Sequence, residues 1–178
     1  GGTHDHEDGD PHVWTDPGNV MIWVKNMTDV LAAADPENAD SYRARGASYL
    51  QKLSGIDGEI RNRISSIPPE RRKLVLDHET FSYFAEEYGL RTVGTVVPGT
   101  SDRAEPSAKE VAALVDVIRK ANVNAIFVSR TASRGLQSLA RTVADEVGRE
   151  VEIIPVLEGI AAPGETGDTY LGFMDYNA

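Results

Sequence analysis

Apolar residues recur at every third or fourth position from about residue 18 to residue 34, which predicts an amphipathic helix. Asp16 and Pro17 come just before it, a capping residue and a proline suited to the first helical position. The residues that share its apolar face are Val20, Val24, Met27, Leu31 and Ala34. A helix of this kind must cover an apolar surface.

The same start signal, Asp35 followed by Pro36, opens a second and longer segment with helical spacing that continues to about Ser66. Most of its positions are polar, and its length corresponds to a helix of ~45 Å at 1.5 Å per residue. Gly55 and Gly58 are the positions at which it could be interrupted. We interpret the segment as a rigid connector between two parts of the protein.

From Arg71 onward the pattern changes to short apolar runs that alternate with helical segments. One of these helices has a capping box, formed by Ser107 and Glu110. The predicted strands are LVLD at 74–77, RTVGTVV at 91–97, AIFV at 125–128 and VEIIPV at 151–156. Alternation of this kind predicts an α/β fold with a parallel sheet covered by helices on both faces.

Composition narrows the chemistry that the chain can carry. The 18 basic and 28 acidic residues give a formal charge of −10, which disfavours nucleic acid as a partner and is compatible with a cation. The chain has no cysteine, so a transition-metal site must use His, Asp and Glu side chains. The sequence shows neither a signal peptide nor an apolar run long enough to span a bilayer.

Three residues are candidates for a site, and each has a structural alternative. His78 follows the strand LVLD, where ligands of parallel sheets bind, but it could merely cap the next helix. His12 lies between two prolines in DGDPHVWTDP, with Asp10 and Asp16 near enough to orient its ring, and could instead be a turn residue. Asp168 follows a glycine-containing loop and could instead be the N-cap of a last helix.

Other polar features are less specific. His4 and His6 form a His-x-His tract in an acidic context, which could hold metal loosely or be a solvated loop. Arg130 and Arg134 could hold an anion but are more simply solvated. There is no phosphate-binding loop, nucleophile elbow or HExxH pair, so we predict neither catalytic nor cofactor-binding residues.

Three motifs taken together resemble those of the metal-binding, substrate-binding proteins of bacterial zinc and manganese ABC transporters. They are DPHVWTDP, HETFSYFAEEYGL and GDTYLGFMDYN, in this order, with the long polar helix between the first two. The resemblance implies two α/β lobes joined by a rigid helix, with the metal held between them. It places the second donor on His12, the third on His78 and the fourth on Asp168. The first donor would belong to an amino-terminal lobe that this chain lacks.

This sequence departs from the family pattern at two points. Glu79 and Thr80 follow His78 where the family usually has Asp and Ala, which leaves the donor in place. Ser129 stands where many members have an acidic residue, and we assign no role to it.

The resemblance also implies a division of the chain. Residues 1–10 would be an acidic loop with histidines, and 11–35 the end of the amino-terminal lobe. Residues 36–67 would be the connecting helix, and 68–178 the carboxyl-terminal α/β lobe.

By this resemblance the protein captures Zn²⁺, or Mn²⁺, as a transported ligand and passes it to a membrane ABC permease. We expect it in the periplasm or as a membrane-anchored lipoprotein outside the cell, monomeric when complete, and not an enzyme. Histidine donors favour zinc over manganese. Two alternatives stay open: a zinc hydrolase that uses two His, one Asp and a metal-bound water, with Glu79 as the base, and a metal-binding adhesin.

Overall fold

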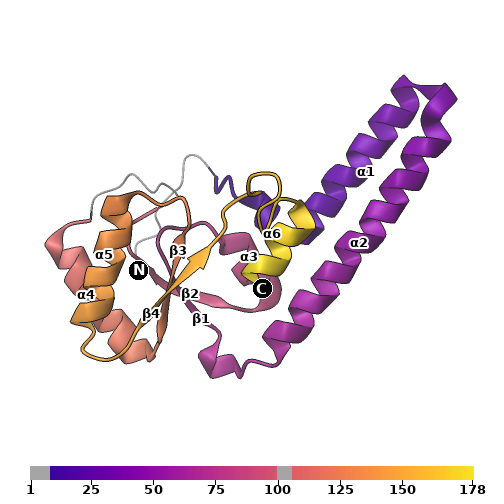
Figure 1. Cartoon of the computed structure of the whole chain (residues 1–178). Coiled ribbons are helices and arrows are strands. Elements are labelled where there is room, and N and C mark those ends of the chain that lie inside the picture. The colour runs from indigo at the N-terminus through magenta and orange to yellow at the C-terminus, as the bar shows by residue number, and fades with distance from the viewer. Residues whose placement is uncertain (1–8, 100–105) are drawn as a thin grey trace. The chain divides into compact units, whose positions relative to one another are not determined.

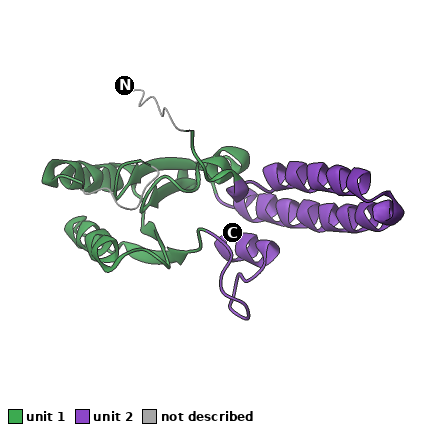
Figure 2. Cartoon of the chain, turned by 90° about the horizontal axis from the view of Figure 1, so that it is seen from above, with its two compact units in different colours: residues 1–13, 68–158 green, residues 14–67, 159–178 purple. Residues whose placement is uncertain are grey.

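The computed structural model describes residues 9–99 and 106–178, and the predicted elements occur in the predicted order. They form two compact units, coloured separately in Figure 2. One unit comprises residues 1–13 and 68–158, and the other comprises residues 14–67 and 159–178. The His4–His6 tract lies outside the described residues.

In the second unit two helices pack side by side (Figure 1). Helix α1 spans Pro17–Ala34, with Asp16 capping it by accepting a hydrogen bond from the Gly18 N–H at 2.7 Å. After a 3-10 turn, Pro36–Asn38, helix α2 spans Ala39–Ser65 without a break at Gly55 or Gly58. The sequence therefore predicted both helices, and of the two possibilities left for the longer one the structure has the uninterrupted helix.

The packing between α1 and α2 depends on a close approach of their backbones. A Cβ atom added at Gly46 would lie 2.3 Å from Oγ1 of Thr28, so no larger residue fits there without a shift. The predicted apolar face of α1 is buried at Val20 and Val24, whereas Met27 and Leu31 are 56% and 48% exposed. The residues that the structure describes therefore cover only the first half of the predicted apolar face.

A short last helix, α6 at Tyr170–Asn177, completes this unit. Its N-cap is Thr169, whose hydroxyl accepts from the Gly172 N–H at 3.1 Å, so Asp168 is not the cap that one reading of the sequence suggested. Asp175 forms an ion pair of 2.6 Å with Arg63 at the end of α2.

The first unit is a parallel sheet with the strand order β2-β1-β3-β4. Helices α4 and α5 pack against each other and against this sheet, and α3 contacts β2 (Figure 1). Along the chain the elements are β1 Lys73–Leu76, α3 Ser82–Tyr88, β2 Arg91–Thr95, α4 Ala108–Ala121, β3 Ala125–Ser129, α5 Arg134–Glu146 and β4 Glu152–Val156. This is the α/β fold that the alternating pattern predicted.

An apolar core lies between the sheet and helices α4 and α5, and it includes Val75, Ile118 and Ile126, all fully buried. The capping box of α4 is present, because Ser107 and Glu110 exchange hydrogen bonds as their spacing predicted. These hydrogen bonds lower the pKa of the Glu110 carboxyl.

All four strands are parallel, so their carboxyl ends lie at one edge of the sheet, where ligands of such folds bind.

No helix within residues 9–99 and 106–178 is long and apolar enough to cross a membrane.

Candidate metal centre

His78 lies directly beyond the carboxyl end of β1, at the centre of the sheet. The backbone of Asp77 still belongs to the sheet, since its N–H donates to the carbonyl of Phe127 and its own carbonyl accepts from Val97, both at 2.9 Å. His78 is only 4% exposed. The position of its imidazole is therefore set by an inner strand that is hydrogen-bonded on both sides.

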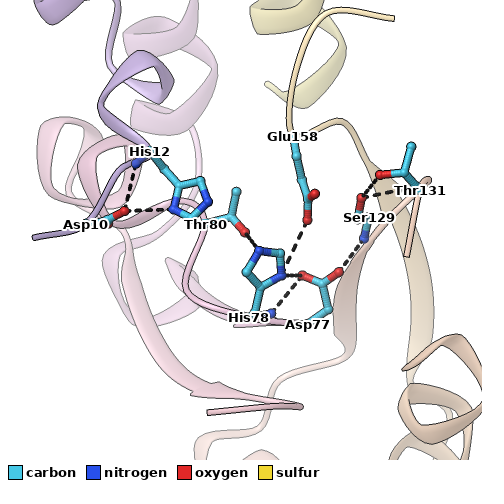
Figure 3. A network of polar contacts seen from close by, with 8 residues as sticks. All are labelled: Asp10, His12, Asp77, His78, Thr80, Ser129, Thr131 and Glu158. Carbon is cyan, nitrogen blue, oxygen red and sulfur yellow. Dashed lines mark hydrogen bonds and ion pairs between the residues drawn. The ribbon is translucent and has the colours of Figure 1, made fainter. Parts of the chain in front are cut away.

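The carboxylate of Asp77 holds the His78 ring from one side (Figure 3). Its Oδ1 accepts from the His78 backbone N–H at 2.8 Å and lies 3.1 Å from the ring Nδ1, while its Oδ2 accepts from the Ser129 N–H at 2.8 Å. Asp77 is 2% exposed, so this charge is stabilised by hydrogen bonds rather than by bulk water. In the neutral imidazole, a carboxylate that accepts a hydrogen bond from Nδ1–H leaves Nε2 as the nitrogen with a lone pair.

A second carboxylate, that of Glu158, faces the same ring nitrogen. Its Oε1 lies 3.5 Å from Nδ1 of His78, and Glu158 comes just after β4 in the chain. Ligand atoms of Asp77, His78 and Glu158 lie within 4.8 Å of one another, a geometry that could hold a cation. Because both carboxylates face Nδ1, we read them as the groups that orient His78 rather than as the primary donors.

Nε2 of His78 contacts the hydroxyl of Thr80 at 2.8 Å. Thr80 is 1% exposed, and its backbone N–H donates to the His78 carbonyl at 2.9 Å. The ring thus has a polar partner at both nitrogens.

His12 repeats this arrangement on a different segment of the chain. It is 8% exposed, and Oδ1 of Asp10 accepts from its backbone N–H at 2.9 Å and lies 2.8 Å from its Nδ1. The Tyr83 hydroxyl donates to the Asp10 carbonyl at 3.4 Å, which links this segment to α3. The expectation that Asp10 orients the His12 ring agrees with these contacts, while Asp16, the other carboxylate considered, caps α1.

The two imidazoles lie next to each other, although 66 positions separate them in the sequence. Their ring centroids are 5.8 Å apart, with an interplanar angle of 66°. Each ring has an aspartate carboxylate at Nδ1, at 2.8 Å in His12 and 3.1 Å in His78, which makes Nε2 the nitrogen whose lone pair could bind a metal ion. Imidazole nitrogens with a carboxylate behind them are favoured ligands for Zn²⁺.

Asp168, the third candidate, belongs to the other compact unit. It is exposed, and its Oδ2 accepts from the Gly164 N–H at 2.9 Å within its own loop. The loop ends at Tyr170, whose hydroxyl donates to the Trp14 carbonyl at 2.9 Å. Burial, and to a lesser extent the nearby carboxylate of Asp16, raises the pKa of the Tyr170 phenol. The exposed carboxylate of Asp168 is therefore followed, two residues later, by a partly buried tyrosine that is hydrogen-bonded to Trp14.

Sequence reasoning missed three residues of this centre. Asp77 looked like the last residue of an apolar strand, and Glu158 belonged to no motif. Thr80 was noted only as a departure from the family pattern. The one available signal was that Asp77 ends one predicted strand and Glu158 stands just past the end of another, where side chains of a parallel sheet converge. Ser129, to which no role was assigned, donates its backbone N–H to Asp77 and pairs its hydroxyl with Thr131 at 2.9 Å.

Comparison with known proteins agrees with this chemistry. The family model described as zinc-uptake complex component A, periplasmic, matches residues 1–178. The chain is 34% identical over 166 residues to the high-affinity zinc uptake system protein ZnuA of Bacillus subtilis, covering 93% of this chain and 49% of that protein. It is 30% identical over 168 residues to the manganese-binding lipoprotein MntA of Halalkalibacterium halodurans, covering 94% and 54%.

Among solved structures, the periplasmic zinc binding protein TroA from Treponema pallidum is similar, with a TM-score of 0.86 and 28% identity. The match covers 98% of this chain and 63% of TroA. The chain thus spans about half the length of the curated relatives named above. Since the family model matches it throughout, the chain belongs to the family of zinc-uptake complex component A.

Proposed function

We propose that this chain takes part in capturing Zn²⁺ outside the cytoplasmic membrane and in delivering it to an ABC permease. His12 and His78 supply two nitrogen donors, and Asp168 supplies a carboxylate. The observation that carries the proposal is the pair of buried imidazoles, 5.8 Å apart, each with an aspartate at Nδ1. The relatives include a zinc uptake protein and a manganese-binding lipoprotein, in keeping with a transported divalent cation.

Zinc is the better fit of these two metals. Neutral imidazole suits the borderline-soft Zn²⁺, whereas Mn²⁺ sites more often add carboxylate or water oxygens. Mn²⁺ also binds a given set of donors more weakly by the general affinity order. We expect the protein to bind Mn²⁺, but less tightly than Zn²⁺.

The test titrates Zn²⁺ into the intact protein in competition with a chelator. If the binding free energy of a tight site, about 10–16 kcal/mol, is shared among four donors, each contributes roughly 3 kcal/mol. We therefore expect His12→Ala, His78→Ala and Asp168→Ala each to weaken binding on the order of a hundred-fold. The control is His6→Ala, which changes a histidine that the proposal does not use as a donor. Unchanged affinity in all three site variants would refute the proposal.

A zinc hydrolase is the competing function, and we infer that the chain is not an enzyme. A hydrolase needs an open coordination position with a water and a base beside it. Spectroscopy of the Co²⁺-substituted intact protein would decide between the two. Four protein donors without water would support capture, and three donors with an exchangeable water would support hydrolysis.

A further inference from the structure

Thr80 occupies the position that the proposed function reserves for the metal. Its hydroxyl lies 2.8 Å from Nε2 of His78, the nitrogen that would bind Zn²⁺. The side chain is almost fully buried, so water does not compensate for the loss of this hydrogen bond.

Which of the two groups donates this hydrogen bond follows from the contacts of the other ring nitrogen, Nδ1. Nδ1 of His78 faces the carboxylates of Asp77 at 3.1 Å and Glu158 at 3.5 Å, both of which accept hydrogen bonds. In the neutral imidazole the proton is therefore on Nδ1, and Nε2 has the lone pair. Thr80 must then donate its O–H to Nε2.

A metal ion needs the same lone pair. Zn²⁺ binds an imidazole nitrogen at 2.0–2.1 Å, along the direction of the lone pair. Nε2 has one lone pair, so it cannot accept from Thr80 and bind zinc at the same time. The backbone of Thr80 is fixed by its N–H donating to the His78 carbonyl at 2.9 Å, which leaves rotation of the side chain as the way to release the ring.

We propose that the Thr80 hydroxyl is a built-in competitor for the metal-binding nitrogen of His78. It holds the ring in its binding orientation when metal is absent, turns aside as Zn²⁺ enters, and returns as Zn²⁺ leaves. It thereby lowers the affinity for Zn²⁺ and favours release. This inference rests on the proposed role of His78 as a donor, and Thr80 acts in it as a positioning residue.

Two variants separate the hydroxyl from the shape of the side chain. Thr80→Val removes the O–H and keeps the volume, whereas Thr80→Ser keeps the O–H. Thr92→Val, at an exposed position of β2, is the matched control for the same chemical change. Thermal unfolding of each variant checks that the fold is retained.

The first measurement needs no metal. In the metal-free intact protein, long-range ¹H–¹⁵N spectra report the resonances of Nδ1 and Nε2 of His78. We expect Thr80→Val to shift Nε2 toward the position of an imidazole nitrogen without a hydrogen bond, with Thr80→Ser and Thr92→Val close to the wild type. An unchanged Nε2 resonance in Thr80→Val would overturn the inference.

The second measurement is the affinity for Zn²⁺ by chelator competition. Loss of the competing hydrogen bond should tighten binding in Thr80→Val about five-fold, which corresponds to roughly 1 kcal/mol, with no change in Thr80→Ser. If Thr80→Val bound Zn²⁺ equally or more weakly than the wild type, and His78→Ala still lost affinity, the inference would be overturned and the proposed function would stand. Equal affinity of His78→Ala and the wild type would instead refute the proposed function.

Discussion

The surroundings of His78 and of Asp168 differ in almost every respect. His78 is buried, follows a central strand of the sheet and has a polar partner at each ring nitrogen. Asp168 is exposed and lies in a loop with two glycines in the left-handed region, Gly164 and Gly167, both at φ +87°. Its carboxylate bonds within that same loop.

Under the proposed function, in which both residues are metal donors, this difference would let tight binding be combined with release. A donor fixed by a sheet is oriented before the metal arrives, so little entropy is lost when the metal binds. A donor on an exposed loop can leave without disturbing the core. We infer that docking to a permease acts on the segment from Gly164 to Gly167 rather than on His78.

The largest effect should come from Asp77→Asn, because it removes a buried charge that accepts from two backbone N–H groups and faces a ring nitrogen. In the asparagine amide, which has the same shape, an NH₂ group replaces one carboxylate oxygen and faces one of these donors, from which it cannot accept a hydrogen bond. We expect a loss of stability of about 2 kcal/mol and a 10–100-fold loss of Zn²⁺ affinity. Denaturant unfolding and chelator competition measure the two quantities. Normal values of both would show that Asp77 does not orient His78.

Asp168→Asn should separate affinity from stability. The amide oxygen can still accept from Gly164, and the side chain is exposed, so the denaturation midpoint should match that of the wild type. Zinc affinity should fall about ten-fold, because a neutral carbonyl oxygen is a poorer ligand than a carboxylate. A clear loss of stability would mean that Asp168 is as structurally important as Asp77, and the contrast between the two regions would be wrong.

Hydrogen exchange should reveal the same contrast without mutation. The amides of Asp77 and Val97 are bonded within the sheet and should be protected with or without metal. The amide of Gly164, which donates to Asp168, should gain protection when Zn²⁺ binds. Mass spectrometry of peptides covering 161–169, 73–80 and 91–97 can test this. Equal protection of the loop in both states would rule it out as the part that moves.

The sequence predicted this fold better than it predicted the site. Helices and strands follow from local patterns and caps, and the start signals at Asp16 and Ser107 both act as their spacing suggested. The polar partners of His78 come from the ends of two strands, Asp77 and Thr80 after β1 and Glu158 after β4, so no local pattern connects Glu158 with the other two. Periodicity identified the apolar face of α1, but it does not show what covers that face, and Met27 and Leu31 in its second half are exposed.

The smallest effect should come from Gly164→Ala. No atom lies within 4 Å of the added Cβ, so the change acts only through the backbone, where φ of +87° is unfavourable for alanine by ~1 kcal/mol. We expect Zn²⁺ affinity to change by no more than about five-fold, by the conversion of that energy. The matched control is Gly58→Ala in helix α2, where an added Cβ also meets no atom within 4 Å. There alanine should stabilise the helix by roughly 0.5–1 kcal/mol, because its helix propensity is higher than that of glycine. If both variants bound zinc like the wild type, the conformation of the loop would not affect the site, and Asp168 could be positioned independently of Gly164.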